Sequence, residues 1–238
     1  MENRKALIFG YPGEYNTENY CEGVFHDIEN YKKYLLSNHG GAWIESDEVH
    51  TEISISRERL SAYINYFDRK ADYSLIVFAG HGEYNLGKKQ TCLQLNREES
   101  ILVSDLYNGN KRQLLIIDCC RKISKILIES RIQDSAIYKS FSNNSDAYRE
   151  KFDQMLKASV EDKIEVYSCD IDEYSRDISN KGGLFSYNLL DEAKGNEDLT
   201  IYKTFEKAKP HVIETSRNMQ NPVIQRPRTG NSFPFYLS

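Results

Sequence analysis

A histidine and a pair of cysteines each follow an apolar run of strand length. His81 comes directly after the run Leu75–Ala79 and Gly80, and Cys119 and Cys120 follow the run Leu114–Ile117 and one aspartate. A cysteine is nucleophilic as its thiolate, and a neighbouring histidine is a common base for forming it. The two segments therefore predict thiol-nucleophile chemistry, provided that the fold brings them together.

The surroundings of these residues favour an active site over ordinary packing, although free cysteine is often simply a buried small apolar residue. Arg121 and Lys122 follow Cys120 at once. Cations and a helix N-terminus lower the pKa of a nearby thiol toward the reactive range. Glycines on both sides of His81 let a substrate backbone come close, and the N–H of Gly82 would serve as a donor there.

The two apolar runs predict central strands of a parallel sheet. Runs without polar alternation are typical of strands buried on both faces and covered by helices. In open α/β sheets, ligands bind beyond the carboxyl ends of the strands. We therefore expect His81 and the Cys119–Cys120 pair side by side at that edge, on neighbouring strands.

The rest of the chain alternates between strand-like and helix-like segments. The expected strands are Lys5–Gly10, Ala42–Ser46, Tyr73–Ala79, Leu114–Asp118, Lys163–Ser168 and Pro222–Gln225. The expected helices are Glu22–Ser37, Ser54–Arg69, Val103–Tyr107, Arg121–Arg131, Gly183–Leu190 and Leu199–Ser216. Residues 84–100 look like a polar hairpin, and residues 170–182 look like a polar loop. This order predicts one α/β domain with a mostly parallel sheet of about six strands, flanked by helices.

The composition of the chain argues against several classes of function. The chain has 238 residues and a formal net charge of −5, which argues against binding nucleic acid by general electrostatics. No apolar run is long enough for a membrane span, and the first residues lack a signal-peptide pattern. Five irregularly spaced cysteines indicate free thiols in a reducing cytoplasm. We expect a cytoplasmic protein without nucleic-acid or membrane partners.

The residues around His81 and Cys120 resemble a known family. The segment FAGHGEYNLG, followed by LLIIDCCRK, is similar to the two catalytic motifs of the caspase-like cysteine peptidases (caspases, metacaspases and paracaspases), and most similar to those of paracaspases. LIFGYPGEY and CEGVFHDIENYKKYL resemble the family's first strand and helix, and YSCDIDEYSRDISNKGGLFSYNLL resembles its small-subunit segment. The resemblance implies a caspase-like three-layer sandwich over residues 1–238. This single domain would divide into a large-subunit-like segment (residues 1–134), an exposed linker (residues 135–163) and a small-subunit-like segment (residues 164–238).

The resemblance also implies roles for the site residues. The family's nucleophile directly precedes the arginine of the second motif, so it is Cys120, and Cys119 holds a variable position. Strand alternation agrees that only one of the two faces the cleft. His81 would be the base, and the N–H groups of Gly82 and Cys120 would form the oxyanion hole. The reaction is thiolate attack on a peptide carbonyl, formation of an acyl-enzyme and hydrolysis. Lys122 departs from caspases, which have glycine there, and agrees with paracaspases.

Three aspartates are candidates for a substrate pocket that binds arginine, or lysine less well. Asp118 lies two residues before Cys120 and so points to the same face of the strand. By resemblance, Asp27 matches an acidic position in the family's first helix region, and Asp177 falls where caspases place an arginine. Three residues near Asp177 are close enough in sequence to exchange roles with it: Asp172, Glu173 and Arg176. A planar guanidinium pairs well with carboxylates; the alternative is that these are ordinary solvated or capping acids.

The segment 135–163 is polar, and in the family the corresponding connection is often cut during activation. Lys139, Arg149 and Lys151 would be self-cleavage sites there; the alternative is a plain surface loop. Bare peptidase domains of this kind resemble bacterial caspase-like proteins, which are usually controlled by an activating partner protein or by proteolysis. Several are linked to antiphage defence, which this resemblance implies as a role.

No cofactor is expected. Asp170, Asp172 and Glu173 form a small acidic cluster, but no EF-hand supports the calcium dependence found in many metacaspases. Zinc-ligand spacing and a phosphate-binding loop are also missing.

Two alternatives stay open: a catalytically inactive caspase-fold scaffold or regulatory protein, and a flavodoxin-like nucleotide or redox protein. The second lacks the phosphate loop it would need.

Overall fold

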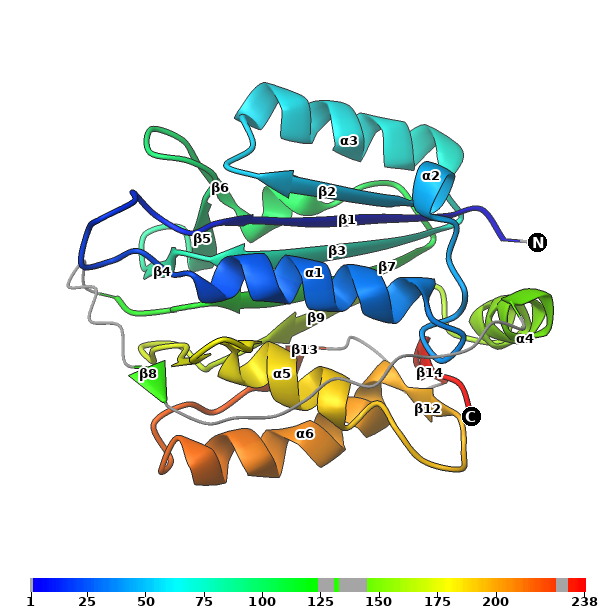
Figure 1. Ribbon diagram of the computed structural model, residues 1–238. Helices are drawn as coiled ribbons and strands as arrows, with labels where there is room; N and C mark the ends of the chain where they lie inside the picture. Colours follow the sequence, from blue (N-terminus) through cyan, green and yellow to red (C-terminus); the bar gives the residue numbers. More distant parts are fainter. Residues whose placement is uncertain (1, 124–130, 133–144, 226–230) are drawn as a thin grey trace.

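A six-stranded sheet forms the centre of the molecule in the computed structural model, which describes residues 2–123, 131–132, 145–225 and 231–238 (Figure 1). The strand order is β13-β9-β7-β3-β1-β2. All neighbours are parallel except β13, which runs antiparallel to β9. The prediction of a mostly parallel sheet of six strands is therefore confirmed. The strands are β1 (Arg4–Tyr11), β2 (Val49–Ile53), β3 (Tyr73–Gly80), β7 (Arg112–Cys119), β9 (Lys163–Tyr167) and β13 (Val223–Gln225).

The two apolar runs lie side by side at the middle of this sheet. β3 and β7 pair in register from Tyr73 and Arg112 to Gly80 and Cys119. Successive side chains alternate between two apolar clusters, one on each face of the sheet. Burial on both faces is the reason for the unbroken apolar sequence, and the pairing brings the ends of both runs to one edge.

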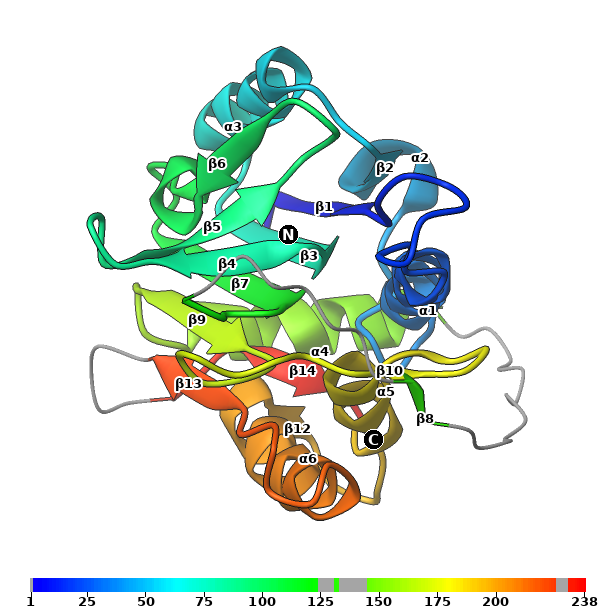
Figure 2. The same cartoon turned by 90° about the vertical axis from the view of Figure 1, so that its left-hand side faces the viewer.

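Helices cover both faces of the sheet (Figures 1 and 2). One face packs against α1 (Gly23–Leu36), α5 (Leu184–Asp191) and α6 (Ile201–Thr215). The other packs against α3 (Arg57–Lys70) and the short helix η1 (Val103–Leu106). Helix α4 (Ser145–Lys157) lies at the end of the sheet where β1 begins and contributes Phe152 and Leu156 to the first cluster.

Smaller sheets lie beside the six-stranded sheet. Residues 84–100, predicted as a hairpin, belong to an antiparallel meander that follows His81 directly. Its strands are β4 (Gly82–Asn85), β5 (Gln90–Gln94) and β6 (Ser100–Leu102). Two further small sheets are formed by β8 (Arg131–Ile132), β10 (Asp177–Ile178) and β11 (Gly182–Gly183), and by β12 (Leu199–Thr200) and β14 (Pro234–Tyr236).

The predicted strand Ala42–Ser46 is wrong. The chain there forms the short helix α2 (Glu45–Glu48), and the second strand is β2, which begins at Val49. Trp43 gave the segment its strand-like appearance, but its ring packs over the guanidinium of Arg4 instead of pairing in the sheet. Three acidic side chains in the first turn of α2 suit a helix N-terminus.

Other differences are smaller. The predicted helix 199–216 begins at Ile201, after a cap in which Thr200 accepts from the Lys203 N–H. The polar segment 170–182 contains β10. Of the predicted helix 121–131, residues 121–123 are not helical, Arg131 belongs to β8, and 124–130 lie outside the described residues. The second half of the segment 135–163 is mostly the packed helix α4.

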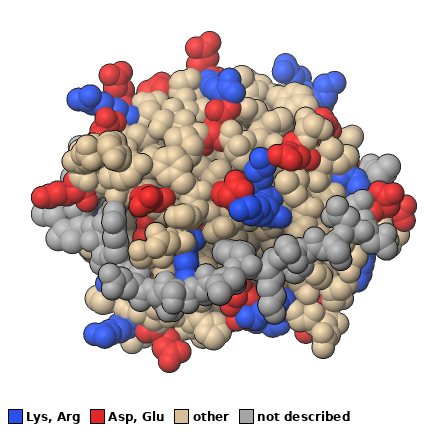
Figure 3. Space-filling view, in the orientation of Figure 1, with Lys and Arg blue, Asp and Glu red and all other residues tan. Residues whose placement is uncertain are grey.

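Charges on the surface are mixed. In the view of Figure 3, acidic and basic side chains are interspersed over the described residues. Ion pairs such as Lys32–Glu45 and Lys33–Glu29 join some of them across and along α1. Exposed pairs of this kind contribute little to stability. Among the helices that the structure describes, none combines the length and the apolar character needed to span a membrane.

Candidate active site

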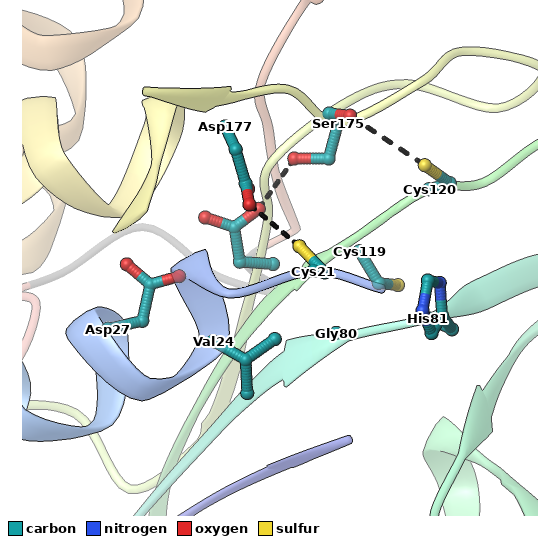
Figure 4. Close-up of a pocket in the computed structure, with 10 residues that line it drawn as sticks. Cys21, Val24, Asp27, Gly80, His81, Cys119, Cys120, Ser175 and Asp177 are labelled. Atoms are coloured by element: carbon teal, nitrogen blue, oxygen red, sulfur yellow. Dashed lines mark hydrogen bonds between the residues drawn. The ribbon is translucent and has the colours of Figure 1, made fainter. Parts of the chain in front are cut away.

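A pocket opens at the carboxyl ends of β3 and β7 and contains the histidine, the cysteine and the three aspartates that the sequence singled out for chemistry (Figure 4). His81 and Cys120 line it together with Asp27, Asp118 and Asp177. The other lining residues are Cys21, Val24, Gly80, Cys119 and Ser175. The topology thus gathers residues from β3, β7, α1 and the small sheet of β10 around one cavity.

His81 occupies the corner between β3 and β4. Gly80 precedes it with φ of +139°, and a Cβ there would lie 2.3 Å from the Tyr11 carbonyl oxygen, so only glycine fits. The His81 Nε2 lies 3.3 Å from the carbonyl oxygen of Pro12. Because a carbonyl only accepts, Nε2 is the donor in this contact.

His81 is buried, with 6% of the surface of the residue exposed. Burial lowers the pKa of His81, and hydrogen bonds to the carbonyls of Pro12 and Asn19 act in the opposite direction. The net shift is downward, so the ring is neutral around pH 7 and suited to accept a proton from a thiol.

The two adjacent cysteines have different environments. Cys119 is 1% exposed and belongs to the apolar cluster on the α3 side, and burial raises the pKa of its thiol well above the usual value. Cys120 is half-buried, and its Sγ lies 3.7 Å from the carbonyl oxygen of Ser175 (Figure 4). Of the pair, Cys120 is the one that is partly accessible to solvent.

The two cations after Cys120 are engaged with other groups. Arg121 is buried, donates to Thr91 Oγ1 at 3.0 Å and to the Cys169 carbonyl at 3.1 Å, and lies over the ring of Tyr167. Lys122 forms an ion pair with Asp172. Their main role in this structure is to tie the loop after β7 to its neighbours, which differs from the direct activation of the thiol that their sequence position predicted.

The N–H of Gly82 points away from β5. Gln94 N donates to the carbonyl of His81 at 3.0 Å, which makes Gly82 and Leu93 a non-hydrogen-bonded pair of the antiparallel ladder. Two residues further on, Tyr84 N donates to the Lys122 carbonyl at 2.9 Å. Because alternate N–H groups of a strand point the same way, the Gly82 N–H faces the side of β4 on which the segment after Cys119 lies.

Asp118 is held at the base of the pocket by hydroxyl and backbone donors. Its carboxylate accepts from Ser175 Oγ at 2.6 Å, from Ser186 Oγ at 2.6 Å and from Ser186 N at 3.1 Å. Ser175 also provides the carbonyl that contacts the Cys120 thiol. Ser175 therefore links the carboxylate to the nucleophile candidate.

Asp27 and Asp177 complete the acidic side of the pocket. The carboxylate of Asp27, on α1, accepts from the Gly183 N–H at 3.0 Å. Asp177, on β10, accepts from the Cys21 thiol at 2.7 Å. Burial, followed by the charges of Asp118 and Asp177, raises the pKa of Asp27 well above its usual value. A raised carboxyl pKa beside other acids indicates a site that favours a cationic ligand.

Each of the three carboxylates packs against a glycine. A Cβ on Gly182 would lie 2.1 Å from Asp27 Oδ1, and a Cβ on Gly183 would lie 2.4 Å from Asp118 Oδ2. A Cβ on Gly23 would lie 2.3 Å from Asp177 Oδ2. The paired glycines of the GGLF segment are thus a sequence signal for the acidic pocket, because any larger residue would displace a carboxylate.

The charged residues near Asp177 in sequence have other partners. Asp172 pairs with Lys122, Glu173 accepts from Asn221, and Arg176 donates to the sulfur of Met219. Asp177 is therefore the charged residue of this segment that lines the pocket. Three further polar residues of the site were not predicted: Cys21, Ser175 and Ser186.

Asp170, Asp172 and Glu173, the small acidic cluster noted in the sequence, do not form a metal site in this structure. Glu173 accepts from the backbone of Asp170 and Asn221. Within residues 2–123, 131–132, 145–225 and 231–238, no group of three or more His, Cys, Asp or Glu side chains has the arrangement to hold a metal ion.

Comparison with known proteins places this chain in a family. The family described as the caspase domain, Peptidase_C14, matches residues 3–233. A search of curated protein sequences gave no significant match. Among solved structures, the crystal structure of caspase-1 from Spodoptera frugiperda is similar with a TM-score of 0.62 at 13% identity, over 98% of this chain and 90% of that one. The fold is therefore the caspase fold, and the chain belongs to the caspase-domain family of cysteine peptidases.

Proposed function

We propose that this protein is a cysteine endopeptidase that cleaves peptide bonds after arginine and, less well, after lysine. The observation that carries the proposal is the pocket in which the thiol of Cys120, the imidazole of His81 and three carboxylates lie together. The first two supply a nucleophile and a base. The carboxylates supply the negative charge that a basic side chain requires.

The chemistry follows from the neutral state of His81. Its imidazole takes the proton of the Cys120 thiol as the sulfur attacks the substrate carbonyl. The Gly82 and Cys120 N–H groups bind the oxygen that becomes negative. The imidazolium then gives its proton to the leaving amine as the C–N bond breaks. Water hydrolyses the thioester and releases the thiol.

The preference for a basic residue follows from the charge of the pocket. The mutual repulsion of Asp27, Asp118 and Asp177 is relieved when a cation enters, since a positive charge favours the ionised carboxyl. Arginine suits this arrangement better than lysine because its planar fork donates to two or more acceptors at fixed angles.

Fluorogenic peptides that differ only in the residue before the scissile bond test the proposal. Arg peptides should be cleaved fastest, Lys peptides more slowly and Asp peptides not at all. Asp118→Asn should reduce kcat/KM for Arg peptides by roughly 10- to 100-fold, the loss expected for a hydrogen-bonded charge pair. Glu58→Gln, at the exposed start of α3, is the matched control. Preference for Asp would overturn the pocket assignment.

The proposed function also includes a biological role for the peptidase. The resemblance to bacterial caspase-like proteins supports a regulated role in defence or cell death in the cytoplasm, with activation by a partner protein or by proteolysis. A catalytically inactive scaffold is the main alternative, and it predicts no hydrolysis of any of these peptides by the wild-type protein.

A further inference from the structure

Cys21 lines the pocket but has no role in the proposed catalysis, and it is not one of the three aspartates that would bind a basic side chain. It lies just before α1, is half-buried and lines the same cavity as His81 and Cys120. Its thiol donates to Asp177 Oδ2 at 2.7 Å (Figure 4). The two residues are 156 positions apart in the chain, so the contact depends on the tertiary fold.

The backbone of Cys21 is fixed independently of its side chain. Cys21 N donates to the Pro12 carbonyl at 2.7 Å, and the same carbonyl is the partner of His81 Nε2. Cys21 is therefore anchored between the base and the acidic pocket. This anchoring fixes the backbone of Cys21 without any contribution from its thiol.

The hydrogen bond affects Asp177 in two ways. A donor directed at a carboxylate favours its ionised form, which opposes the repulsion from neighbouring acids. It also restrains the rotation of the carboxylate. The thiol contacts the same oxygen against which Gly23 packs, so this oxygen is held from two sides. A carboxylate accepts several hydrogen bonds, so the thiol contact is compatible with a substrate cation on the same group.

We propose that Cys21 is a specificity-determining residue, whose thiol holds the carboxylate of Asp177 in the orientation that binds a basic substrate side chain. This inference rests on the proposed function. A thiol is a weak and uncharged donor, so it stabilises the carboxylate without supplying a cation that would compete with the substrate.

The test is the steady-state kinetics of Arg peptides with wild type, Cys21→Ala, Cys21→Ser and Asp177→Asn. Cys21→Ala should raise KM by about 3- to 10-fold with kcat changed by less than about 2-fold, the range expected for loss of one hydrogen bond of ordinary strength. Cys21→Ser keeps a donor of similar size and should retain a wild-type KM.

Cys92 supplies the matched control, because it is a half-buried free cysteine on β5 that does not line the pocket. Cys92→Ala should leave KM unchanged. The inference alone is overturned if Asp177→Asn raises KM while Cys21→Ala does not, or if Cys21→Ser raises KM as Asp177→Asn does. The second comparison decides the matter even if Cys21→Ala does not fold. Absence of Arg-peptide hydrolysis by the wild type overturns both this inference and the proposed function.

Discussion

Asp27 lies where two other carboxylates already concentrate negative charge. Burial and the charges of Asp118 and Asp177 raise the pKa of Asp27 well above its usual value. The Gly183 N–H acts in the opposite direction, and it is not sufficient to restore the ordinary pKa. A buried acid in this state destabilises the fold when it ionises and favours any ligand that brings a positive charge.

This charge predicts a pH dependence of stability. Above about pH 4, the ordinary pKa of aspartic acid, the unfolded chain has lost a proton that folded Asp27 retains. Because the folded state binds more protons, the stability contributed by this group is lost as pH rises from there through the raised pKa. Asp27→Asn removes the group, so its Tm relative to wild type should increase over that range. Thermal unfolding followed by circular dichroism measures it.

The control for that series is Asp72→Asn, a surface aspartate that accepts from the Asn3 N–H. Its Tm should stay parallel to that of the wild type across the same pH range. Parallel curves for Asp27→Asn would show that Asp27 titrates normally, and the account of the acidic pocket would then be wrong.

At the scale of elements, Arg121 connects three segments around the site. Its guanidinium donates to Thr91 on β5 and to the Cys169 carbonyl beyond β9, and it lies 4.1 Å from the ring centroid of Tyr167. The meander that follows His81 and the loop that carries Cys120 are thus fixed relative to each other. Lysine at this position would lose the fork and the stacking.

Arg121→Lys should therefore destabilise the fold by about 2–3 kcal/mol, the range expected for a disrupted buried polar network. Urea unfolding measures the loss. Arg69→Lys, in the exposed last turn of α3, should change the free energy of unfolding by less than about 0.5 kcal/mol. Equal effects of the two substitutions would contradict a linking role for Arg121.

Helix α4 is attached to the sheet by a buried charge network. Glu48 lies between Arg4 and Arg149, and Arg4 also pairs with Asp153 of α4. Burial lowers the pKa of Arg4 to about 10, so its guanidinium is still charged at neutral pH. The network therefore depends on Glu48 to neutralise two cations.

Glu48→Gln leaves these two cations without their shared carboxylate and should cost about 3–5 kcal/mol in the free energy of unfolding. Lys151→Gln is the matched control in the same helix, since Lys151 pairs with Asp198 at the surface. Its cost should be below about 1 kcal/mol. Chemical denaturation of both variants makes the comparison, and a small cost for Glu48→Gln would refute the network as the anchor of α4.

At the scale of the whole molecule, the structure argues against two of the three predicted self-cleavage sites. Arg149 is inside α4 and bound to Glu48, and Lys151 is in the same helix and bound to Asp198. A helical, paired residue does not enter a protease site without local unfolding. Of the three basic residues predicted as cleavage sites, Lys139 is the one we retain, and it lies outside the described residues.

Purified wild type should accordingly yield fragments cut after Lys139, and Cys120→Ala should remain intact. The fragments should elute together in size-exclusion chromatography, because β9 of the second fragment pairs with β7 of the first. Mass spectrometry identifies the cut. Cleavage after Arg149, or the same fragments from Cys120→Ala, would refute self-cleavage at this position.

The sequence predicted those elements whose signal is local. β3 and β7 were recognisable because strands buried on both faces give unbroken apolar runs. The second strand was predicted wrongly at Trp43. A short apolar segment can be a strand, or it can carry a side chain that packs over the end of the sheet, and the sequence does not distinguish the two. The contact of Cys21 with Asp177 was not predictable, because nothing in either segment specifies a partner 156 residues away.

Treatment with a peptidyl chloromethylketone that ends in arginine tests the central claim most directly. The reagent alkylates a nucleophile only where a basic side chain is bound beside it. Mass spectrometry should locate one adduct on Cys120 in the wild type and in Cys119→Ala. It should find none in Cys120→Ala and much slower labelling in His81→Ala. An adduct on Cys119, or preferential labelling by the aspartate analogue, would contradict the account.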